Sequence, residues 1–320
     1  MKIWKRGMMA SACLMMAVFL AGCSVTEALS AAKRGEREYG KAETMMILST
    51  ERLRYETVYS EEIWNASVDS DGMTFEAAML GQVHDFLKEI KTLNLMAKEQ
   101  KADLSAKDKE LAKTAASEYM KAIGESLAGE FGIEEKSAEE FYRDYRLAQQ
   151  MAETIAGSMD LEVSDSEARV ILVSQIEFSD RETAENVLRK IQEDGALFDA
   201  AAEEYSEDSE IRGPVFRGMR GAEYETAVFA LEEGGISGVL SDSGKYYLVK
   251  CVDDYDEEAT KLRKEEMIRE KTGSVFYSQY QSFAREHPLT EDKDLWNSLT
   301  VTGNPKAEAD FFAIYEAVWE

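Results

Sequence analysis

Histidine, cysteine and proline are scarce in this 320-residue chain, which contains two, three and three of them. The two histidines, His84 and His287, are far apart, and no cysteine stands near either. No segment therefore has the cysteine and histidine spacing of a zinc site, and no metal is expected. No glycine-rich loop leads from a strand into a helix, and no serine-nucleophile motif occurs. A nucleotide or other small-molecule cofactor is accordingly not expected.

Positive charge is also in short supply, with 37 Lys and Arg against 63 Asp and Glu and a formal net charge of −26. Such a chain is not expected to bind nucleic acid or to dock electrostatically on anionic lipid. The hydrophobic content of 44% and the aromatic content of 10% are typical of globular proteins. The length suits about two domains of roughly 150 residues.

The N-terminus has the pattern of a targeting segment. Lys2, Lys5 and Arg6 precede an apolar run, Met8–Leu20, that is too short for a stop-transfer helix. The run ends in LAGC at Cys23, which resembles the lipobox of bacterial lipoproteins. The resemblance implies a signal peptide at 1–22 and a lipid on Cys23, which predicts a lipid-anchored protein on the extracytoplasmic face of a bacterial membrane. An ordinary signal peptide with an accidental cysteine, or an uncleaved anchor, are the alternatives.

A polar tether at 23–44 and a helical region at 45–160 are expected to follow. Apolar residues recur at three- and four-residue steps between Phe75 and Ala97, as on one face of an amphipathic helix. Ser105 and Ser137 each stand three residues before an acidic residue, which predicts a helix beginning after each serine. No proline interrupts the chain before Pro214, so these helices can be long.

The spacing of apolar residues changes at 166–253, where a separate domain is expected. ARVILVSQIEF (168–178) predicts a strand, helices are expected at 198–205 and 222–231, and Asp242-Ser-Gly244 predicts a hairpin turn between ISGVL and YYLVKCV. Cys251 is predicted to be a buried strand residue. A helical region at 256–320 follows, and it is expected to pack on the N-terminal helices, so that the α+β domain is an insertion.

Several stretches in this order resemble the parvulin (rotamase) family of peptidyl-prolyl cis-trans isomerases. The resemblance rests on ARVILV, GALFDAAAEEYSED, YETAVFAL, GGISGVLSDSG and YLVKCV. It implies an antiparallel sheet with helices. Together with the lipobox and the helical regions, the arrangement resembles the PrsA-like lipid-anchored foldases and their SurA-like helical chaperone module. The predicted fold class is α+β, with the parvulin domain inserted into that module. The resemblance favours the cell membrane over an outer membrane.

The usual active site of the family is degenerate here. The positions of its two histidines carry Val170 and Tyr247, and the position of its acid or cysteine carries Ile211. In the proline pocket, Phe229 matches the family. The usual methionine falls on Arg220, or on Met219 after a slip of one residue, and Met219, Arg220, Phe229 and Tyr247 are the candidates for a peptide groove.

The family's reaction is rotation about an X–Pro amide, whose barrier is about 18–20 kcal/mol. The side chains of Val170 and Ile211 cannot hydrogen-bond, and Tyr247 alone keeps a donor and an acceptor. Lost or weak isomerase activity is therefore favoured. The open alternatives are a foldase that assists secreted proteins, a non-catalytic holdase and a scaffold lipoprotein. The expected partners are unfolded or proline-containing secreted polypeptides and the membrane, and a homodimer is possible.

Overall fold

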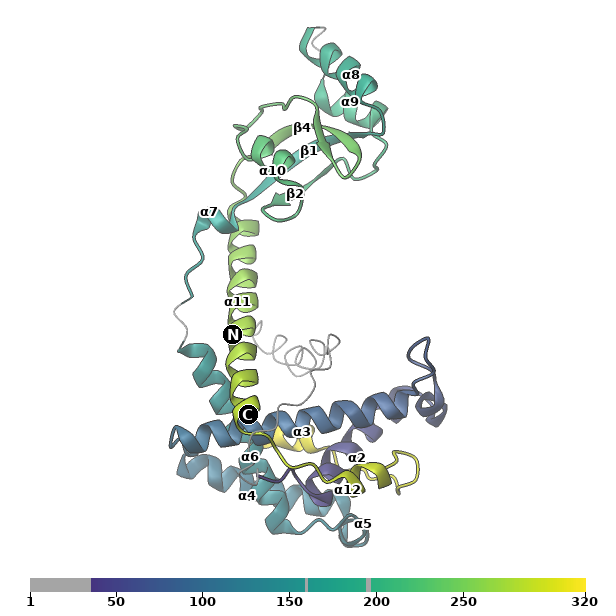
Figure 1. Cartoon of the computed structure of the whole chain (residues 1–320), viewed down its shortest axis with the longest axis vertical. Helices are drawn as coiled ribbons and strands as arrows, with labels where there is room; N and C mark the ends of the chain where they lie inside the picture. The colour runs from purple at the N-terminus through teal and green to yellow at the C-terminus, as the bar shows by residue number, and fades with distance from the viewer. Residues whose placement is uncertain (1–35, 159–160, 194–196) are drawn as a thin grey trace. The chain divides into compact units, whose positions relative to one another are not determined.

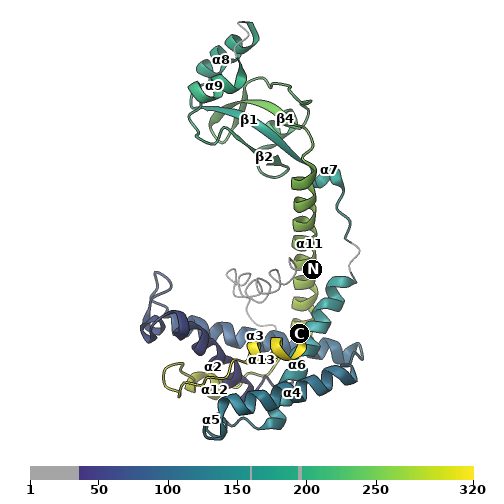
Figure 2. The same cartoon turned by 180° about the vertical axis from the view of Figure 1, so that it is seen from behind.

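The computed structural model describes residues 36–158, 161–193 and 197–320 (Figure 1 and Figure 2). Contacts divide the chain into two units. A helical unit comprises the described residues up to Ser158 together with Phe276–Glu320, and a sheet unit comprises those within Met159–Val275. The predicted signal peptide 1–22, the predicted lipidation site Cys23 and the first part of the tether lie outside the described residues.

The helical unit consists of a bundle of long and short helices. Within the described ranges, no helix is both long enough and apolar enough to cross a membrane. The elements in chain order are α2 (Lys41–Val58), the 3-10 helix η2 (Glu61–Asn65), α3 (Phe75–Glu99), α4 (Ala106–Ile123), α5 (Glu125–Phe131), α6 (Glu135–Gly157), the last part of α11 (Glu257–Glu286), α12 (Lys293–Ser298) and α13 (Phe311–Trp319).

Helix α2 lies inside this unit, with every residue from Thr44 to Arg52 buried. Its one buried ion pair joins Arg52 Nε to Glu56 Oε1 at 2.7 Å. The indole Nε1 of Trp64, which is buried, donates to the same Glu56 oxygen at 3.0 Å. These partners stabilise charges that burial would otherwise destabilise.

The helix starts follow local capping chemistry, with one difference from expectation. Ser105 caps α4 by accepting from the backbone N of Asp108 at 3.0 Å, as predicted. The prediction that Ser137 precedes a helix is wrong, because α6 already begins at Glu135. There Ser137 is the third helical residue, and its Oγ accepts from the backbone N of Glu134 at 3.0 Å. The serine therefore satisfies a free backbone donor from inside the first turn.

The C-terminal helix α13 contributes to the core of the helical unit. The ring of Phe311 stacks on that of Tyr142 in α6, with centroids 4.3 Å apart. Both side chains are fully buried. Trp319 Nε1 donates to Asp108 Oδ1 of α4 at 3.0 Å. Aromatic pairing of this kind adds to the free energy gained from burial.

The sheet unit holds a four-stranded antiparallel sheet with the order β2-β1-β4-β3. The predicted strand at 168–178 is β1, so the sequence placed it within two residues. The strands are β1 (Val170–Phe178), β2 (Arg212–Phe216), β3 (Leu240–Asp242) and β4 (Lys245–Asp253), and the helices are α7 (Asp165–Ala168), α8 (Arg181–Glu193), α9 (Phe198–Tyr205), α10 (Ala222–Val228) and the first part of α11 (Glu257–Glu286).

The hairpin between β3 and β4 is the turn that the sequence predicted. Ser243 and Gly244 have φ values of 50° and 80°, as in a type I′ turn. The preceding run is mostly irregular, because Ile236 makes only an isolated bridge to Lys250 and β3 begins at Leu240. Helix α10 ends at Val228, three residues before the predicted end.

Candidate functional site

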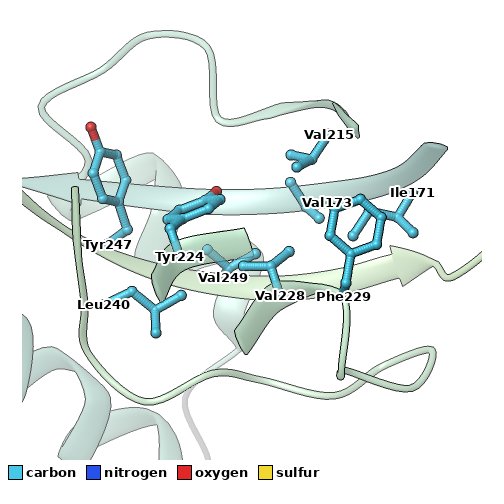
Figure 3. Close-up of a cluster of buried hydrophobic side chains, with 9 residues drawn as sticks. All are labelled: Ile171, Val173, Val215, Tyr224, Val228, Phe229, Leu240, Tyr247 and Val249. Atoms are coloured by element: carbon cyan, nitrogen blue, oxygen red, sulfur yellow. The ribbon is translucent and has the colours of Figure 1, made fainter. Parts of the chain in front are cut away.

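Strand alternation gives the sheet two buried faces, because successive side chains point to opposite sides. On one face, Tyr247 and Val249 of β4 join Ile171 and Val173 of β1 in a cluster that is covered by α10. On the other face, Leu248 packs with α8 and α9. Figure 3 shows the first cluster, with Tyr247 and Tyr224 toward one end and Phe229 beside Ile171 toward the other. We call the side of the sheet with Tyr247 and Phe229 the Tyr247 face.

Tyr247 is part of a polar network at the end of this cluster. Its phenol donates to Glu177 Oε2 at 3.0 Å, and Arg220 Nη1 donates to the phenol oxygen at 3.5 Å. The Arg220 guanidinium also lies 5.2 Å from the centre of the Tyr247 ring. Glu177 is directly opposite Tyr247 in the β1–β4 ladder, which explains why the two side chains meet.

Further ion pairs hold both ends of this network. Lys245 Nζ lies 3.0 Å from Glu177 Oε1, and Arg220 Nη1 lies 3.6 Å from Asp242 Oδ2. Asp242 Oδ1 also accepts from the backbone N of Gly221 at 3.0 Å. Arg220 is therefore positioned between an acid on β3 and the phenol on β4, and its guanidinium is only partly exposed.

The two tyrosines remain protonated at neutral pH. Burial, followed by the hydrogen bond to Glu177, raises the pKa of Tyr247. Burial raises the pKa of Tyr224 to about 12, and nearby Arg220 partly opposes this shift. The Tyr224 phenol donates to Gln175 Oε1 at 3.1 Å. Both phenols are thus hydrogen-bond donors and not bases, and each already donates its one proton to a neighbour, Glu177 or Gln175.

Phe229 lies at the other end of the cluster and is only 8% exposed. The guanidinium of Arg217 stands over its ring at 4.4 Å, and that of Arg169 at 5.8 Å. Arg169 is held by the backbone carbonyl of Asp254, to which its Nε donates at 2.8 Å. Met219 in the same loop as Arg217 is exposed. The Phe229 ring is thus buried beneath two guanidinium groups, which interact with its face.

The structure brings together only some of the predicted site residues. Tyr247 and Phe229 share one cluster, and Arg220 contacts Tyr247. Ile211 instead packs against the cluster under α8 and α9, on the opposite face. Val170 is buried next to Ile171 in β1 and so points away from the Tyr247 face. The assignment of Val170, Ile211 and Tyr247 to the family's catalytic positions stays a prediction.

Sequence reasoning missed the other members of this polar network. Glu177 and Tyr224 contact Tyr247, Gln175 accepts from Tyr224, and Asp242 pairs with Arg220. One available signal was the alternation along β1, where Gln175 and Glu177 follow Ile171 and Val173 on the same face. Two polar residues that continue an apolar face indicate a polar end to the cluster. Their partners could not be identified without the strand register.

Other features of the described residues offer no cofactor site. The described ranges contain no group of three or more His, Cys, Asp or Glu residues that could hold a metal. Cys251 is buried in β4, as predicted, and burial raises the pKa of its thiol. A cavity of about 170 Å³ between α8 and α9, lined by residues such as Leu197 and Tyr205, is on the side of the sheet opposite Tyr247.

Comparisons with known proteins agree with this architecture. Residues 161–264 match the PPIC-type PPIASE domain family. "Foldase protein PrsA 2" of Bacillus cereus is 27% identical over 181 residues, which cover 52% of this chain and 63% of the relative. The match thus spans less than two thirds of the length of that relative.

Solved structures with low sequence identity are also similar. A peptidylprolyl isomerase (PrsA) from Bacillus cereus matches 79% of this chain and 99% of its own, with 18% identity and a TM-score of 0.41. A SurA-like chaperone from Campylobacter jejuni matches 70% of this chain and 99% of its own, with 13% identity and a TM-score of 0.26.

The sheet unit therefore contains a parvulin domain of the PPIC type. Outside this domain the comparisons give a likeness only, to a PrsA foldase that aligns with about half of the chain. Both the predicted family resemblance and the predicted α+β fold class, with an antiparallel sheet in a mostly helical chain, are confirmed.

Proposed function

We propose that this protein is a folding factor for secreted polypeptides, attached by a lipid on Cys23 to the extracytoplasmic face of a bacterial membrane, with the cell membrane favoured over an outer one. The observation that carries the proposal is the PPIC-type domain at 161–264, in which Phe229, directly after α10, and Tyr247 of β4 share one cluster. The clients would be unfolded or proline-containing chains. The domain limits proposed from the sequence, with a helical region at 45–160, a parvulin domain at 166–253 and a helical region at 256–320, belong to this proposal.

In this proposal an X–Pro segment binds on the Tyr247 face. The apolar cluster around Phe229 would accept the proline ring, which gains free energy from leaving water. Arg220 would donate a hydrogen bond to a carbonyl group beside it, and the Tyr247 phenol would do so only after breaking its bond to Glu177. Isomerisation forms no covalent bond, so a site that favours the twisted amide over the planar one lowers the barrier by that difference alone.

A second candidate is a holdase that binds unfolded chains without isomerising them. Three observations favour it. Val170 and Ile211 offer no side-chain hydrogen bond and lie away from Tyr247, and the Tyr247 phenol is already engaged by Glu177. Covered by Arg217, the Phe229 ring has little free surface in the described conformation.

One experiment separates the two candidates. The chain from Ser24 onward is assayed for cis-to-trans conversion of short X–Pro peptides and, separately, for suppression of aggregation of an unfolded protein. Phe229→Leu keeps the core filled but changes the ring surface, and Tyr246→Phe is the control on the other side of the sheet. Acceleration that Phe229→Leu reduces and Tyr246→Phe does not would support the foldase.

Suppressed aggregation without acceleration would support the holdase instead. If neither activity is detected, the proposed folding function fails. The anchor is tested in cells by Cys23→Ser, which should release the protein from the membrane fraction, while Cys251→Ser should leave it bound. A membrane-bound Cys23→Ser variant would contradict lipid anchoring at this residue.

A further inference from the structure

An exposed apolar segment lies between α2 and α3, in the helical unit and outside the parvulin domain. Val58, Tyr59, Val68 and Met73 are 73%, 53%, 46% and 50% exposed. They are half of the large apolar side chains found exposed in the described part of the chain, and they occur within 16 consecutive residues. We call residues 58–74 the tip. Figure 1 shows this segment projecting beyond the first turn of α3.

Part of the tip is an ordered hairpin, held by backbone hydrogen bonds. Ser67 pairs with Thr74, and the backbone N of Val68 donates to the carbonyl of Met73 at 2.9 Å. Val68 and Met73 therefore stand opposite each other across a short hairpin. Asp69 Oδ1 closes this hairpin by accepting from the backbone N of Asp71 at 3.0 Å and of Met73 at 2.9 Å.

A cluster of aromatic side chains packs where the tip joins the helical unit. Trp64 is buried, and its ring lies 5.4 Å from that of Phe75. Tyr55 lies 4.9 Å from Phe75 and stacks on Tyr59 at 6.4 Å. The exposed side chains are thus presented by a fixed backbone, which reduces the entropy lost when a partner binds.

The charge of the tip selects among partners. From Tyr55 to Val83 the sequence contains no Lys, Arg or His, but six acidic residues. Two of these point inward, since Glu56 pairs with Arg52 and Glu76 accepts from the backbone N of Val301 at 2.6 Å. The other four, Glu61, Glu62, Asp69 and Asp71, are exposed, and only Glu61 has an ion pair, with Arg52 at 3.4 Å.

We infer that the tip is a docking site for unfolded polypeptide segments that combine apolar and basic residues. Apolar contact with Val58, Tyr59, Val68 and Met73 would supply the binding, and the exposed carboxylates would attract cationic side chains. An anionic membrane surface does not fit, because the same carboxylates would be repelled. A second copy does not fit either, because two identical acidic tips would repel each other. The inference rests on the proposed function for the source of the polypeptide, but it does not involve the parvulin site.

The test measures binding of a probe that the parvulin site has no reason to select. The probe is a labelled, proline-free, unstructured peptide of leucine, serine and lysine, and its counterpart carries glutamate in place of every lysine. Fluorescence anisotropy gives the affinity of the chain from Ser24 onward for each. The basic peptide should bind more tightly, and the difference should shrink at roughly 0.5 M salt, where exposed charges are screened.

Two double variants examine the two parts of the surface. Val68→Ser with Met73→Ser should weaken binding of the basic peptide about tenfold, as expected for loss of central apolar contacts. Glu62→Gln with Asp71→Asn should weaken it about threefold and reduce its salt dependence. Neither pair includes Asp69, whose carboxylate closes the hairpin. Leu262→Ser, which alters an exposed leucine elsewhere, should leave the affinity unchanged.

Equal affinity of the Val68→Ser/Met73→Ser variant and the unmodified chain, with both folded by circular dichroism, would overturn the inference. So would tip-dependent flotation with anionic vesicles, or a tip-dependent dimer by light scattering, in the absence of peptide binding. The proposed function is judged separately by the aggregation and X–Pro assays. A chain that suppresses aggregation equally well with an altered tip would retain that function and refute only the docking site.

Discussion

The phenol of Tyr247 donates a hydrogen bond of 3.0 Å to Glu177, which is its direct neighbour across the β1–β4 ladder. Glu177 also forms an ion pair with Lys245, whose Nζ lies 3.0 Å from Glu177 Oε1. Tyr247 is therefore hydrogen-bonded to an acid and contacted by Arg220. The contribution of this polar end of the cluster to the stability of the sheet unit can be measured.

Tyr247→Phe should lower the free energy of unfolding of the sheet unit by about 1 kcal/mol, the usual net value of one hydrogen bond. The loss should stay small because Glu177 keeps its pairing with Lys245. In the chain from Ser24 onward, Cys251 is the one cysteine, and it is buried in β4, so its rate of thiol labelling in denaturant reports opening of this sheet. Tyr246→Phe, on the other face, should label at the unmodified rate. Identical rates for Tyr247→Phe would contradict a stabilising role for the network.

Thr260→Val should destabilise the sheet unit more, by about 1–3 kcal/mol, because it leaves a buried donor unsatisfied. The Thr260 Oγ1 in α11 accepts from the backbone N of Val170 at 3.0 Å, and both residues are buried. Thr260→Ser keeps the hydroxyl and is the matched control. Labelling of Cys251 again provides the measurement. If the valine variant were as stable as the serine variant, this hydrogen bond would not contribute to the start of β1.

Glu56→Gln should destabilise the helical unit by about 2–3 kcal/mol at neutral pH, because a neutral amide no longer compensates the buried charge of Arg52. Trp64, Trp296 and Trp319 lie in this unit and residues 159–275 contain no tryptophan, so tryptophan fluorescence in urea follows its unfolding. Glu62→Gln, on an exposed acid, is the control.

Glu56→Gln should also change how the stability of the helical unit depends on pH in acid. Burial alone would raise the pKa of Glu56, but hydrogen bonds from Arg52, Trp64 and Lys306 lower it below its ordinary value of 4.5. A lowered folded-state pKa gives stability that is present above 4.5 and is lost as the pH falls through the folded value. The difference between Glu56→Gln and the unmodified chain should therefore shrink in acid. A constant difference from neutral pH to pH ~3 would contradict this assignment.

Glu89→Gln should act in the opposite pH direction. Burial, followed by repulsion from Asp85, raises the pKa of Glu89 from 4.5 to about 7. The stability linked to its proton is complete below 4.5 and is lost as the pH rises through about 7. The glutamine variant should thus match the unmodified chain in mild acid and exceed it by about 1–3 kcal/mol at pH ~8. Glu110→Gln on exposed surface is the control, and the tryptophan signal is the measurement. If Glu89→Gln were no more stable than the unmodified chain at pH ~8, ionisation of Glu89 would not destabilise the folded state.

Local sequence patterns were sufficient for many of the elements. The cap at Ser105, the strand 168–178, the helix 198–205 and the turn at Ser243-Gly244 are each determined by residues close together in the chain. The start of α6 was misplaced because a serine three residues before an acid can be either the cap or, as Ser137 is, a residue of the first turn. Both arrangements satisfy the same backbone donors.

The sequence by itself determined the parvulin-type order of elements, the acidic charge and the alternation that gives the sheet two buried faces, because these depend on local spacing and composition. Only the tertiary structure decided that Glu177 lies opposite Tyr247 and that Ile211 and Tyr247 are on different faces. Strand register and loop path bring such residues together, and a shift of one residue in register would turn each side chain to the other face. The same holds for the tip, where acidic and apolar residues of one loop became a surface only because Trp64 and Phe75 fix its base.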